Sequence, residues 1–170
     1  SNYPKPDLCV LAGYMLIVSE EMCSQFNMIN LHPAAPDGPT GTWQEVIWKL
    51  IENKADHSGV MTHLVTPKLD KGPVVSYCRF PLDRNGFPDL WKSVEKRSID
   101  EVKSIEGEKN SLFKQIRYQG AIRELPLLIN TLKAFSEKRI KISDNHILNQ
   151  NGNIIQGYDL SKEIDRLVSG

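Results

Sequence analysis

The sequence has no excess of charge of either sign. Its 170 residues include 21 lysines and arginines against 21 aspartates and glutamates, so the formal net charge at pH 7 is zero. A chain without net charge exerts no long-range attraction on nucleic acid or on an anionic membrane surface. We therefore expect neither nucleic acid nor a membrane as a partner.

Cysteine is also scarce, and metal-binding spacings are lacking. The three cysteines and four histidines form no C-x-x-C or H-x-x-x-H pattern, so the sequence predicts no metal site. A secretory signal and a long apolar span are absent from the sequence as well, which indicates reduced thiols and a cytoplasmic protein. With 40% hydrophobic residues and no internal repeat, residues 1–170 are expected to form a single domain.

Short apolar runs alternate with segments of helical periodicity, which predicts an α/β fold. The expected strands are residues 9–11, 28–29, 60–65 and 73–81. A helix should begin at Thr42, because Thr42 and Glu45 have the spacing of a capping box, and it should end near residues 53–56.

The second half of the chain predicts further helices and a hairpin. Residues 83–115 are rich in charge and are expected to be a solvent-facing helical insertion. Apolar periodicity from Ser111 predicts a long C-terminal helix that restarts at Pro126, since proline suits the first turn of a helix. Asn151-Gly152 between apolar runs favours the tight turn of a terminal hairpin, and a short closing helix should begin near residue 159.

Three polar residues stand close to the ends of predicted strands. Asn30 and His32 follow the apolar residues 28–29 and lie two positions apart, so an extended backbone turns both side chains to one side. Asp70 lies in the loop after residues 60–65. Ligands of open parallel sheets bind outside the carboxyl ends of the strands, so we expect these three residues to meet in one cleft.

Their chemistry suits acyl transfer. When an amine attacks a formyl carbonyl, negative charge builds on the oxygen and the nitrogen must lose a proton. Asn30 and His32 can donate hydrogen bonds to that oxygen, while Asp70 can polarise His32 and take the proton, directly or through a water. Each motif alone has a simpler interpretation, since Asp-Lys-Gly-Pro is ordinary turn chemistry and a histidine after a strand is usually structural. Only the ordered set predicts a site.

The segments Asn30–Pro33 and Ser58–Pro73 carry motifs whose order and spacing resemble the folate-dependent formyltransferases, most closely the glycinamide ribonucleotide type. The resemblance spans roughly residues 3–80. It implies the C-terminal part of a Rossmann-like formyltransferase fold, with a mostly parallel sheet, a long C-terminal helix and a terminal β-hairpin. It also implies that a formyl group passes from 10-formyltetrahydrofolate, as co-substrate, to the primary amine of glycinamide ribonucleotide in purine biosynthesis.

The resemblance also implies a role for individual residues. Asn30, His32 and Asp70 would be catalytic, and His63 and Glu124 would contact the substrate. The strand and loop at residues 6–15 look like the part of the family that packs against the pterin. The residues that would bind the cofactor come from two loops: Met15, Leu16, Ile17, Val18, Thr66, Pro67, Lys68 and Leu69.

The chain departs from the family in three places. Residues 34–41 replace the usual Ser-Leu-Leu-Pro, and Leu16 stands where an arginine often holds the glutamate tail of folate. Family members also have strands, helices and a glycine-containing phosphate loop before the segment that matches residues 6–8. We therefore expect residues 1–170 to be a fragment of a longer enzyme, lacking the upstream phosphate-binding half and poorly active alone. Homo-oligomer formation and association with the missing half both stay open.

Other functions share the same residues. A formyltransferase for another amine, such as a sugar nucleotide, or a formyltetrahydrofolate hydrolase would use the same trio of Asn30, His32 and Asp70. A non-catalytic fragment that serves as an assembly partner is the alternative from another class.

Overall fold

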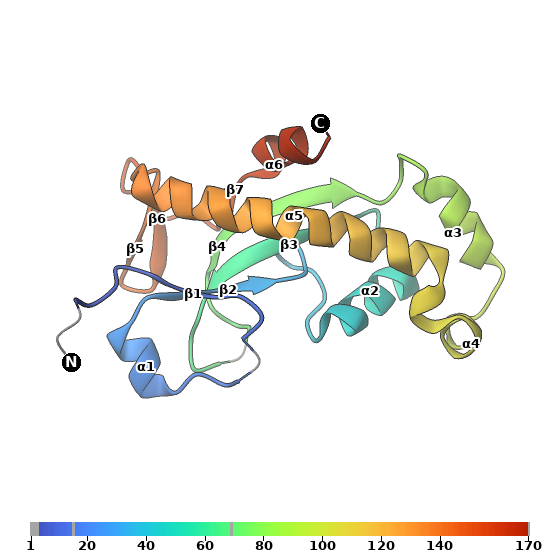
Figure 1. Cartoon of the computed structure of the whole chain (residues 1–170), viewed down its shortest axis with the longest axis horizontal. Helices are drawn as coiled ribbons and strands as arrows, with labels where there is room; N and C mark the ends of the chain where they lie inside the picture. The colour runs from blue at the N-terminus through green and yellow to red at the C-terminus, as the bar shows by residue number, and fades with distance from the viewer. Residues whose placement is uncertain (1–3, 15, 69, 170) are drawn as a thin grey trace.

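A computed structural model of the chain describes residues 4–14, 16–68 and 70–169. A five-stranded sheet forms its centre, and one long helix crosses a face of that sheet (Figure 1). The sheet strands, in chain order, are β1 (Cys9–Leu11), β2 (Met28–His32), β3 (His57–Leu64), β4 (Val74–Pro81) and β7 (Tyr158–Asp159). A separate hairpin consists of β5 (Ile140–Ser143) and β6 (His146–Asn149). The helices are α1 (Glu20–Gln25), α2 (Trp43–Glu52), α3 (Phe87–Glu95), α4 (Ile99–Ile105), the 3₁₀ turn η1 (Gly107–Lys109), α5 (Ser111–Ser136) and α6 (Ser161–Val168).

The sheet confirms the expected α/β class, with the strand order β1-β2-β3-β4-β7. Its two outer pairings, β1 with β2 and β4 with β7, are parallel, as the resemblance implies. The two central pairings, of β3 with β2 and with β4, are antiparallel. The register of β2 on β3 places Asn30 directly opposite His63.

Helix α2 begins where the capping box predicts. The Thr42 hydroxyl accepts a hydrogen bond from the backbone N–H of Glu45 at 3.3 Å, and the Glu45 carboxylate accepts one from the Thr42 N–H at 2.7 Å. The helix turns Val46, Ile47, Leu50 and Ile51 into the core, so these residues form its apolar face.

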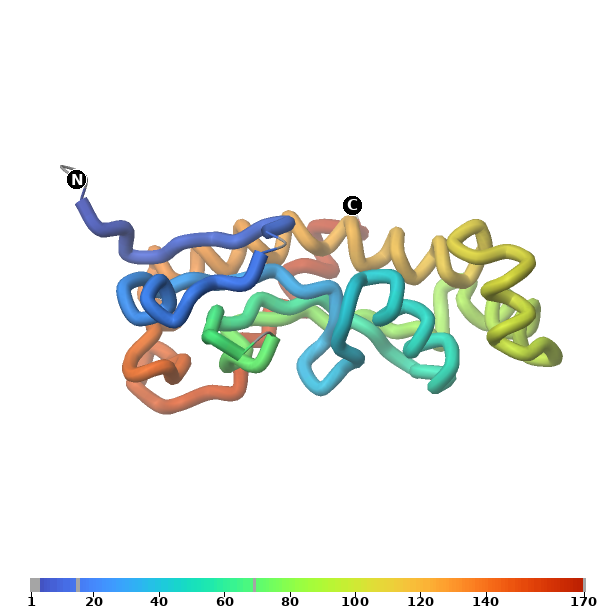
Figure 2. The backbone as a smooth tube through the Cα atoms, turned by 90° about the horizontal axis from the view of Figure 1, so that it is seen from below, coloured from blue at the N-terminus to red at the C-terminus, as the bar shows by residue number. Residues whose placement is uncertain are grey.

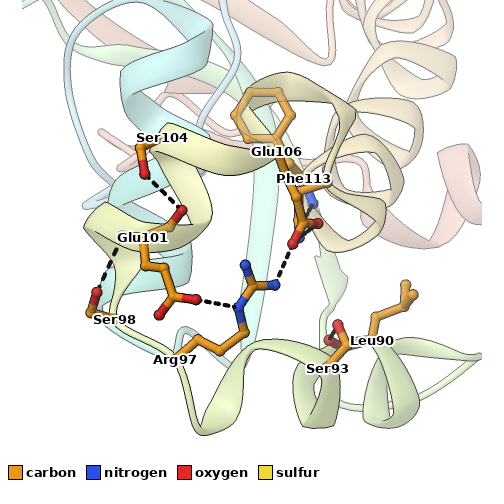
Figure 3. A network of polar contacts seen from close by, with 9 residues as sticks. Leu90, Ser93, Arg97, Ser98, Glu101, Ser104, Glu106 and Phe113 are labelled. Atoms are coloured by element: carbon orange, nitrogen blue, oxygen red, sulfur yellow. Dashed lines mark hydrogen bonds and ion pairs between the residues drawn. The ribbon is translucent and has the colours of Figure 1, made fainter.

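The segment 83–115 is helical, as predicted, but the expectation that it faces solvent is wrong. Phe87, Val94 and Val102 are buried in the same core as α2, because each helix turns an apolar side inward. Its charged residues lie on the other side, where the Arg97 guanidinium pairs with the carboxylates of Glu101 and Glu106 and joins α3 to α4 (Figure 3). The prediction was wrong because it relied on the high charge content of the segment and overlooked the apolar residues on one side of each helix.

A series of hydrogen-bonded hydroxyl groups connects α5 to the centre of the sheet. Thr62 on β3 and Ser76 on β4 share a hydrogen bond at 2.8 Å, and Ser76 shares another with Thr131 on α5 at 2.5 Å. The Thr131 hydroxyl donates to the Leu127 carbonyl at 2.7 Å. All three hydroxyl residues are fully buried, so these bonds remove the cost of burying the polar groups.

The terminal hairpin is confirmed, but its turn lies elsewhere. Asp144 and Asn145, with φ of 48° and 59°, form the two-residue turn between β5 and β6, and their two positive φ angles are those of a type I′ turn. The predicted turn, Asn151-Gly152, instead brings the chain back so that Ile154 bridges to Leu148. Asn145 and Gly152, with φ of 59° and 80°, are both residue types that tolerate positive φ, so residue type alone did not separate the two sites.

Helix α5 runs without interruption through Pro126, so the predicted restart is wrong. Proline has no N–H to donate within the helix, and packing of neighbours such as Arg123, Leu127 and Thr131, all buried, holds the helix in place.

Replacing Pro126 by alanine should therefore stabilise the protein. The new N–H restores the missing helical hydrogen bond, so the free energy of unfolding in urea should rise by about 1–3 kcal/mol. Pro88→Ala is the matched control, because Pro88 lies in the first turn of α3, where proline is favourable. An equal gain in both variants, or none at Pro126, would contradict this explanation.

Candidate functional site

The residues predicted from the strand ends meet at one place. Asn30 and His32 lie two positions apart on β2, His63 faces Asn30 from β3, and Asp70 approaches from the loop that follows β3. The Asn30 amide nitrogen is 3.3 Å from Nε2 of His63, and the Asp70 carboxylate lies 3.3 Å from the same His63 nitrogen. The other Asp70 oxygen is 4.0 Å from Nδ1 of His32, which is within the reach of one bridging water.

A tight turn brings Asp70 back to the strands. Asp70 adopts the left-handed conformation, with φ of 51°, and Gly72 follows it against the end of β3. A Cβ atom on Gly72 would lie 1.6 Å from the Leu64 carbonyl oxygen, so only glycine fits there. The Leu64 N–H also donates to the Pro73 carbonyl at 2.8 Å, which fixes both ends of the turn.

His63 connects Asn30 with Asp70 through a single ring nitrogen. Its Nδ1 lies 3.1 Å from the Leu64 carbonyl, which can only accept, so Nδ1 carries a proton. Nε2 is left facing both Asn30 and Asp70. That nitrogen either accepts from the Asn30 amide or, when protonated, donates to Asp70, so Asn30 and Asp70 compete for it.

His32 is held in its neutral form. Burial lowers the pKa of His32 below 6.5, and the Asp70 carboxylate opposes this shift by favouring the charged ring. The nearby ring of His63 lowers the pKa further. Nε2 of His32 is buried and has no hydrogen-bond partner among the residues that the structure describes, so no described protein group occupies this ring nitrogen.

A narrow pocket opens beside these residues. Asn30, His63 and Asp70 form its polar side, and the apolar lining comes from the loops after β1 and β3: Leu11, Tyr14, Leu16, Ile17, Val18, Val65, Thr66 and Pro67. Its volume of about 50 Å³ is far below the roughly 300–1,000 Å³ of ligand pockets. The side chains of Leu16 and Ile17 are 71% and 80% exposed, so this wall can move outward without unpacking the core.

The lining matches most of the expected cofactor residues. Leu16, Ile17, Val18, Thr66 and Pro67 line the pocket. Lys68 is exposed in the same loop without lining it, and Met15 and Leu69 lie outside the described residues. Val65 also lines the pocket, although it was not among the expected cofactor residues. Its position directly before Thr66 could have indicated this.

Glu124 does not join this group. Its carboxylate pairs with Arg117 on the same helix, at 2.5 Å, and the Arg117 guanidinium stacks on the ring of Trp43. Its contact with a substrate stays a prediction. In the described part of the chain, no cluster of His, Cys, Asp or Glu side chains is arranged to hold a metal ion, and no helix is long and apolar enough to cross a membrane.

Comparison with known proteins identifies the family. Residues 2–89 match the formyl transferase family, and this match covers just over half of the chain. The chain belongs to the formyl transferase family. The matched residues include Asn30, His32, His63 and Asp70.

Curated relatives refine the comparison. A phosphoribosylglycinamide formyltransferase of Dictyostelium discoideum is 35% identical over 106 residues, which are 56% of this chain and 50% of the relative. One from Haemophilus influenzae is 28% identical over 143 residues, covering 82% of this chain and 54% of the relative. The chain thus spans about half the length of the curated relatives that it matches.

Solved structures share the fold. The phosphoribosylglycinamide formyltransferase of Coxiella burnetii superposes with a TM-score of 0.55 at 21% identity, over 91% of this chain and 61% of the other. A formyltetrahydrofolate deformylase of Pseudomonas syringae superposes with a TM-score of 0.54 at 22% identity, over 84% of this chain and 40% of the other. At this identity the likeness establishes the fold.

The lowered pKa of His32 gives a test of the site. Asp70→Asn removes the attraction that raises this pKa, so the imidazole should titrate at lower pH than in the unchanged protein, as measured by NMR. Asp56→Asn, beside the exposed His57, is the matched control and should leave His32 unchanged. A His32 pKa that stays constant or rises in Asp70→Asn would contradict the electrostatic account.

Stability should depend on pH in the corresponding direction. The folded pKa of His32 lies below the unfolded value of about 6.5, so the unfolded chain binds more protons as the pH falls through that value. The contribution of His32 to the free energy of unfolding should be constant above about pH 7 and decline below about 6.5. His32→Gln should reduce this decline in urea titrations, and an unchanged pH profile would contradict the assignment.

Proposed function

We propose that the protein transfers a formyl group from 10-formyltetrahydrofolate to a primary amine, that of glycinamide ribonucleotide. The observation that carries this proposal is the convergence of Asn30, His32 and Asp70 at one place, where Asn30 and Asp70 also line the pocket formed by the loops after β1 and β3. Membership of the formyl transferase family and the names of the curated relatives support the reaction and the acceptor. The proposal concerns the whole protein, of whose relatives this chain spans about half.

The residues divide the chemistry between them. The amine nitrogen attacks the formyl carbon, the new C–N bond forms, and the carbonyl electrons move to the oxygen. The Asn30 amide donates a hydrogen bond to this oxyanion, and the neutral His32 ring donates another in the tautomer that carries its proton on Nε2. Both bonds stabilise the oxyanion more strongly than the uncharged carbonyl. Asp70 takes the proton released by the attacking nitrogen, directly or through a water.

Collapse of the intermediate completes the transfer. The oxyanion re-forms the carbonyl, the bond to N10 of the folate breaks, and N10 takes a proton as it leaves. Asp70 can return the proton that it accepted, so the site ends in its starting protonation state. His63 holds the Asp70 carboxylate at 3.3 Å during both transfers and is therefore a positioning residue in this scheme.

The donor would enter between the two apolar loops. Leu16, Ile17 and Pro67 present hydrocarbon surface for a flat ring, while backbone groups near Thr66 supply hydrogen bonds. The narrowness of the pocket requires the exposed Leu16-Ile17 wall to move as the donor binds. Water in place of the amine would give hydrolysis of the donor, a reaction for which the structurally similar deformylase is named.

Loss of His32 or Asp70 should affect turnover more than binding. His32→Ala and Asp70→Asn should each lower kcat by about 10²–10⁴-fold with little change in the KM for the donor, because both groups act in the transition state. The assay follows tetrahydrofolate release with glycinamide ribonucleotide as acceptor. His57→Ala, an exposed histidine outside the pocket, is the control.

Three outcomes would decide between the candidates. Unchanged kcat in both variants would show that the trio is structural. Tetrahydrofolate release at the same rate without the amine would show hydrolysis instead of transfer. No release with or without the amine in a longer chain that contains the relatives' additional length would remove the catalytic proposal.

The loop after β3 can be tested separately by donor binding. The Thr66 hydroxyl donates to the Lys68 carbonyl at 3.0 Å and keeps the loop in shape. Thr66→Val should weaken binding of a reduced-folate analogue by about fivefold, as expected from one lost hydrogen bond of about 1 kcal/mol. Thr40→Val, in a loop outside the pocket, should bind normally. Equal affinities of all three proteins in a fluorescence titration would exclude this loop from the donor site.

A further inference from the structure

The pairing of β3 with β4 is irregular beside His63. Thr62 lies opposite Ser76, but the next residue of β3 lies opposite Val74 instead of Val75. Val75 is therefore an extra residue of β4, as in a β-bulge. A β-bulge bends its strand and redirects the side chains beside it, and bulges are common next to active sites. This bulge lies directly beside a histidine of the candidate site.

The bulge determines where the loop that carries Asp70 ends. Beyond the bulge, the Leu64 N–H donates to the Pro73 carbonyl at 2.8 Å, which closes the loop against the end of β3. Without the extra residue in the pairing, Val75 would lie opposite His63, and the loop would be one residue longer. The position of the Asp70 carboxylate, 3.3 Å from Nε2 of His63, therefore depends on this bulge.

Helix α5 holds both residues at the bulge. Successive side chains of a regular strand point to opposite faces, yet Val75 and Ser76 both lie on the side of α5. Val75 is fully buried in the apolar cluster that includes Ala134, and the Ser76 hydroxyl lies 2.5 Å from that of Thr131. Ala134 and Thr131 are three residues apart on the helix and therefore lie on one side of it. The bulge is thus held by packing and by a hydrogen bond.

The protons of the buried hydroxyl groups follow a single order. Each hydroxyl carries one proton, and a backbone carbonyl can only accept. The Thr131 hydroxyl donates to the Leu127 carbonyl at 2.7 Å, so it accepts from Ser76. Ser76 uses its only proton for that bond and therefore accepts from Thr62, at 2.8 Å. Loss of the Thr131 hydroxyl would leave the Ser76 proton without its acceptor at a fully buried position.

These contacts connect α5 with the acid–base pair on the other face of the sheet. Figure 2 shows the loop between β3 and β4 (green) on the side of the strands away from α5 (orange). Thr62 directly precedes His63, so a change at the bulge also moves the ring that contacts Asp70. We propose that Thr131 is a positioning residue for formyl transfer. Through the buried hydroxyl groups it keeps the bulge in the form that sets His63 against Asp70.

This role rests on the proposed function, because it affects turnover only if His63 and Asp70 take part in the reaction. Thr131→Val tests it, since valine has nearly the shape of threonine but no hydroxyl. The kcat should fall by at least about tenfold, because a displacement of about 1 Å can cost about 10²-fold in rate. Binding of a reduced-folate analogue should stay the same, as expected for a group that acts on the transition state alone.

Three further variants show whether the hydroxyl itself is responsible. Thr131→Ser keeps the hydroxyl and should retain the kcat of the unchanged protein. Ser136→Ala is the matched control, because the Ser136 hydroxyl donates to the Lys133 carbonyl and its hydrogen bond stays within α5. Ser76→Ala breaks the same series of hydrogen bonds at its centre and should lower kcat as Thr131→Val does. It also tests the proposal if Thr131→Val does not fold.

A combination with Asp70→Asn separates positioning from a general loss of active protein. If Thr131 acts through the Asp70 carboxylate, Thr131→Val should lower kcat no further once Asp70 is replaced by asparagine. A general loss of active protein would lower kcat by the same factor with and without Asp70→Asn.

NMR of the histidine ring nitrogens gives a measurement that needs no turnover. Nε2 of His63 lies beside the Asp70 carboxylate, so its resonance should shift in Asp70→Asn. Thr131→Val should shift it in the same direction, and Thr131→Ser should leave it in place. If the unchanged protein transfers no formyl group, the proposed function fails, while this measurement still decides whether Thr131 positions His63.

Three results would overturn the proposal. The first is a Thr131→Val protein with unchanged kcat and an unchanged His63 resonance. The second is a loss of kcat in Thr131→Val that is equally large in the presence of Asp70→Asn. The third is a Thr131→Ser protein that is impaired as strongly as Thr131→Val, which would show that packing around this side chain, and not its hydroxyl, sets the rate.

Discussion

The antiparallel pairing of β2 with β3 is the constraint on which the site depends. Its register sets Asn30 opposite His63 and leaves His32 two residues further along the same strand. A shift of β2 by one residue would turn Asn30 and His32 to the other face and away from His63, because side chains alternate along a strand. On the other face of the sheet, the hydrogen-bonded hydroxyl groups of Thr62, Ser76 and Thr131 of α5 hold β3 in this position.

The backbone turn at Asp70 and Gly72 places the Asp70 carboxylate, the proposed acid–base group, beside β2 and β3. Gly72 allows the chain to pass within contact distance of the end of β3, and the left-handed conformation of Asp70 turns its carboxylate back towards both histidines. The cost of burying these groups is offset by mutual contacts: His63 is anchored to the Leu64 carbonyl, and Asp70 lies between His63 and His32. This arrangement favours a neutral His32 ring, whose Nε2 has no hydrogen-bond partner in the described part of the chain.

Features that depend on neighbouring residues alone could be predicted from the sequence, as long as tertiary packing did not override them. The capping box at Thr42 and the alternation that places Asn30 and His32 on one side are set by neighbouring residues, and both predictions were confirmed. The continuity of α5 through Pro126 was missed, because packing against the sheet outweighs the local cost of proline. Burial of Phe87 and Val94 was missed because only the folded core shows which side of a charged segment turns inward. The contact of His63 with Asp70 depends on a loop turn that no spacing rule specifies.

The central claim is that Asp70 and His63 act as one unit in formyl transfer. A double-mutant cycle on kcat, with His63→Ala, Asp70→Asn and the combined variant, tests this most directly. If His63 acts by positioning Asp70, the double variant should be no slower than Asp70→Asn alone. Losses that multiply, so that the double variant falls by the product of the two single effects, would show that the two residues act independently and would contradict the account.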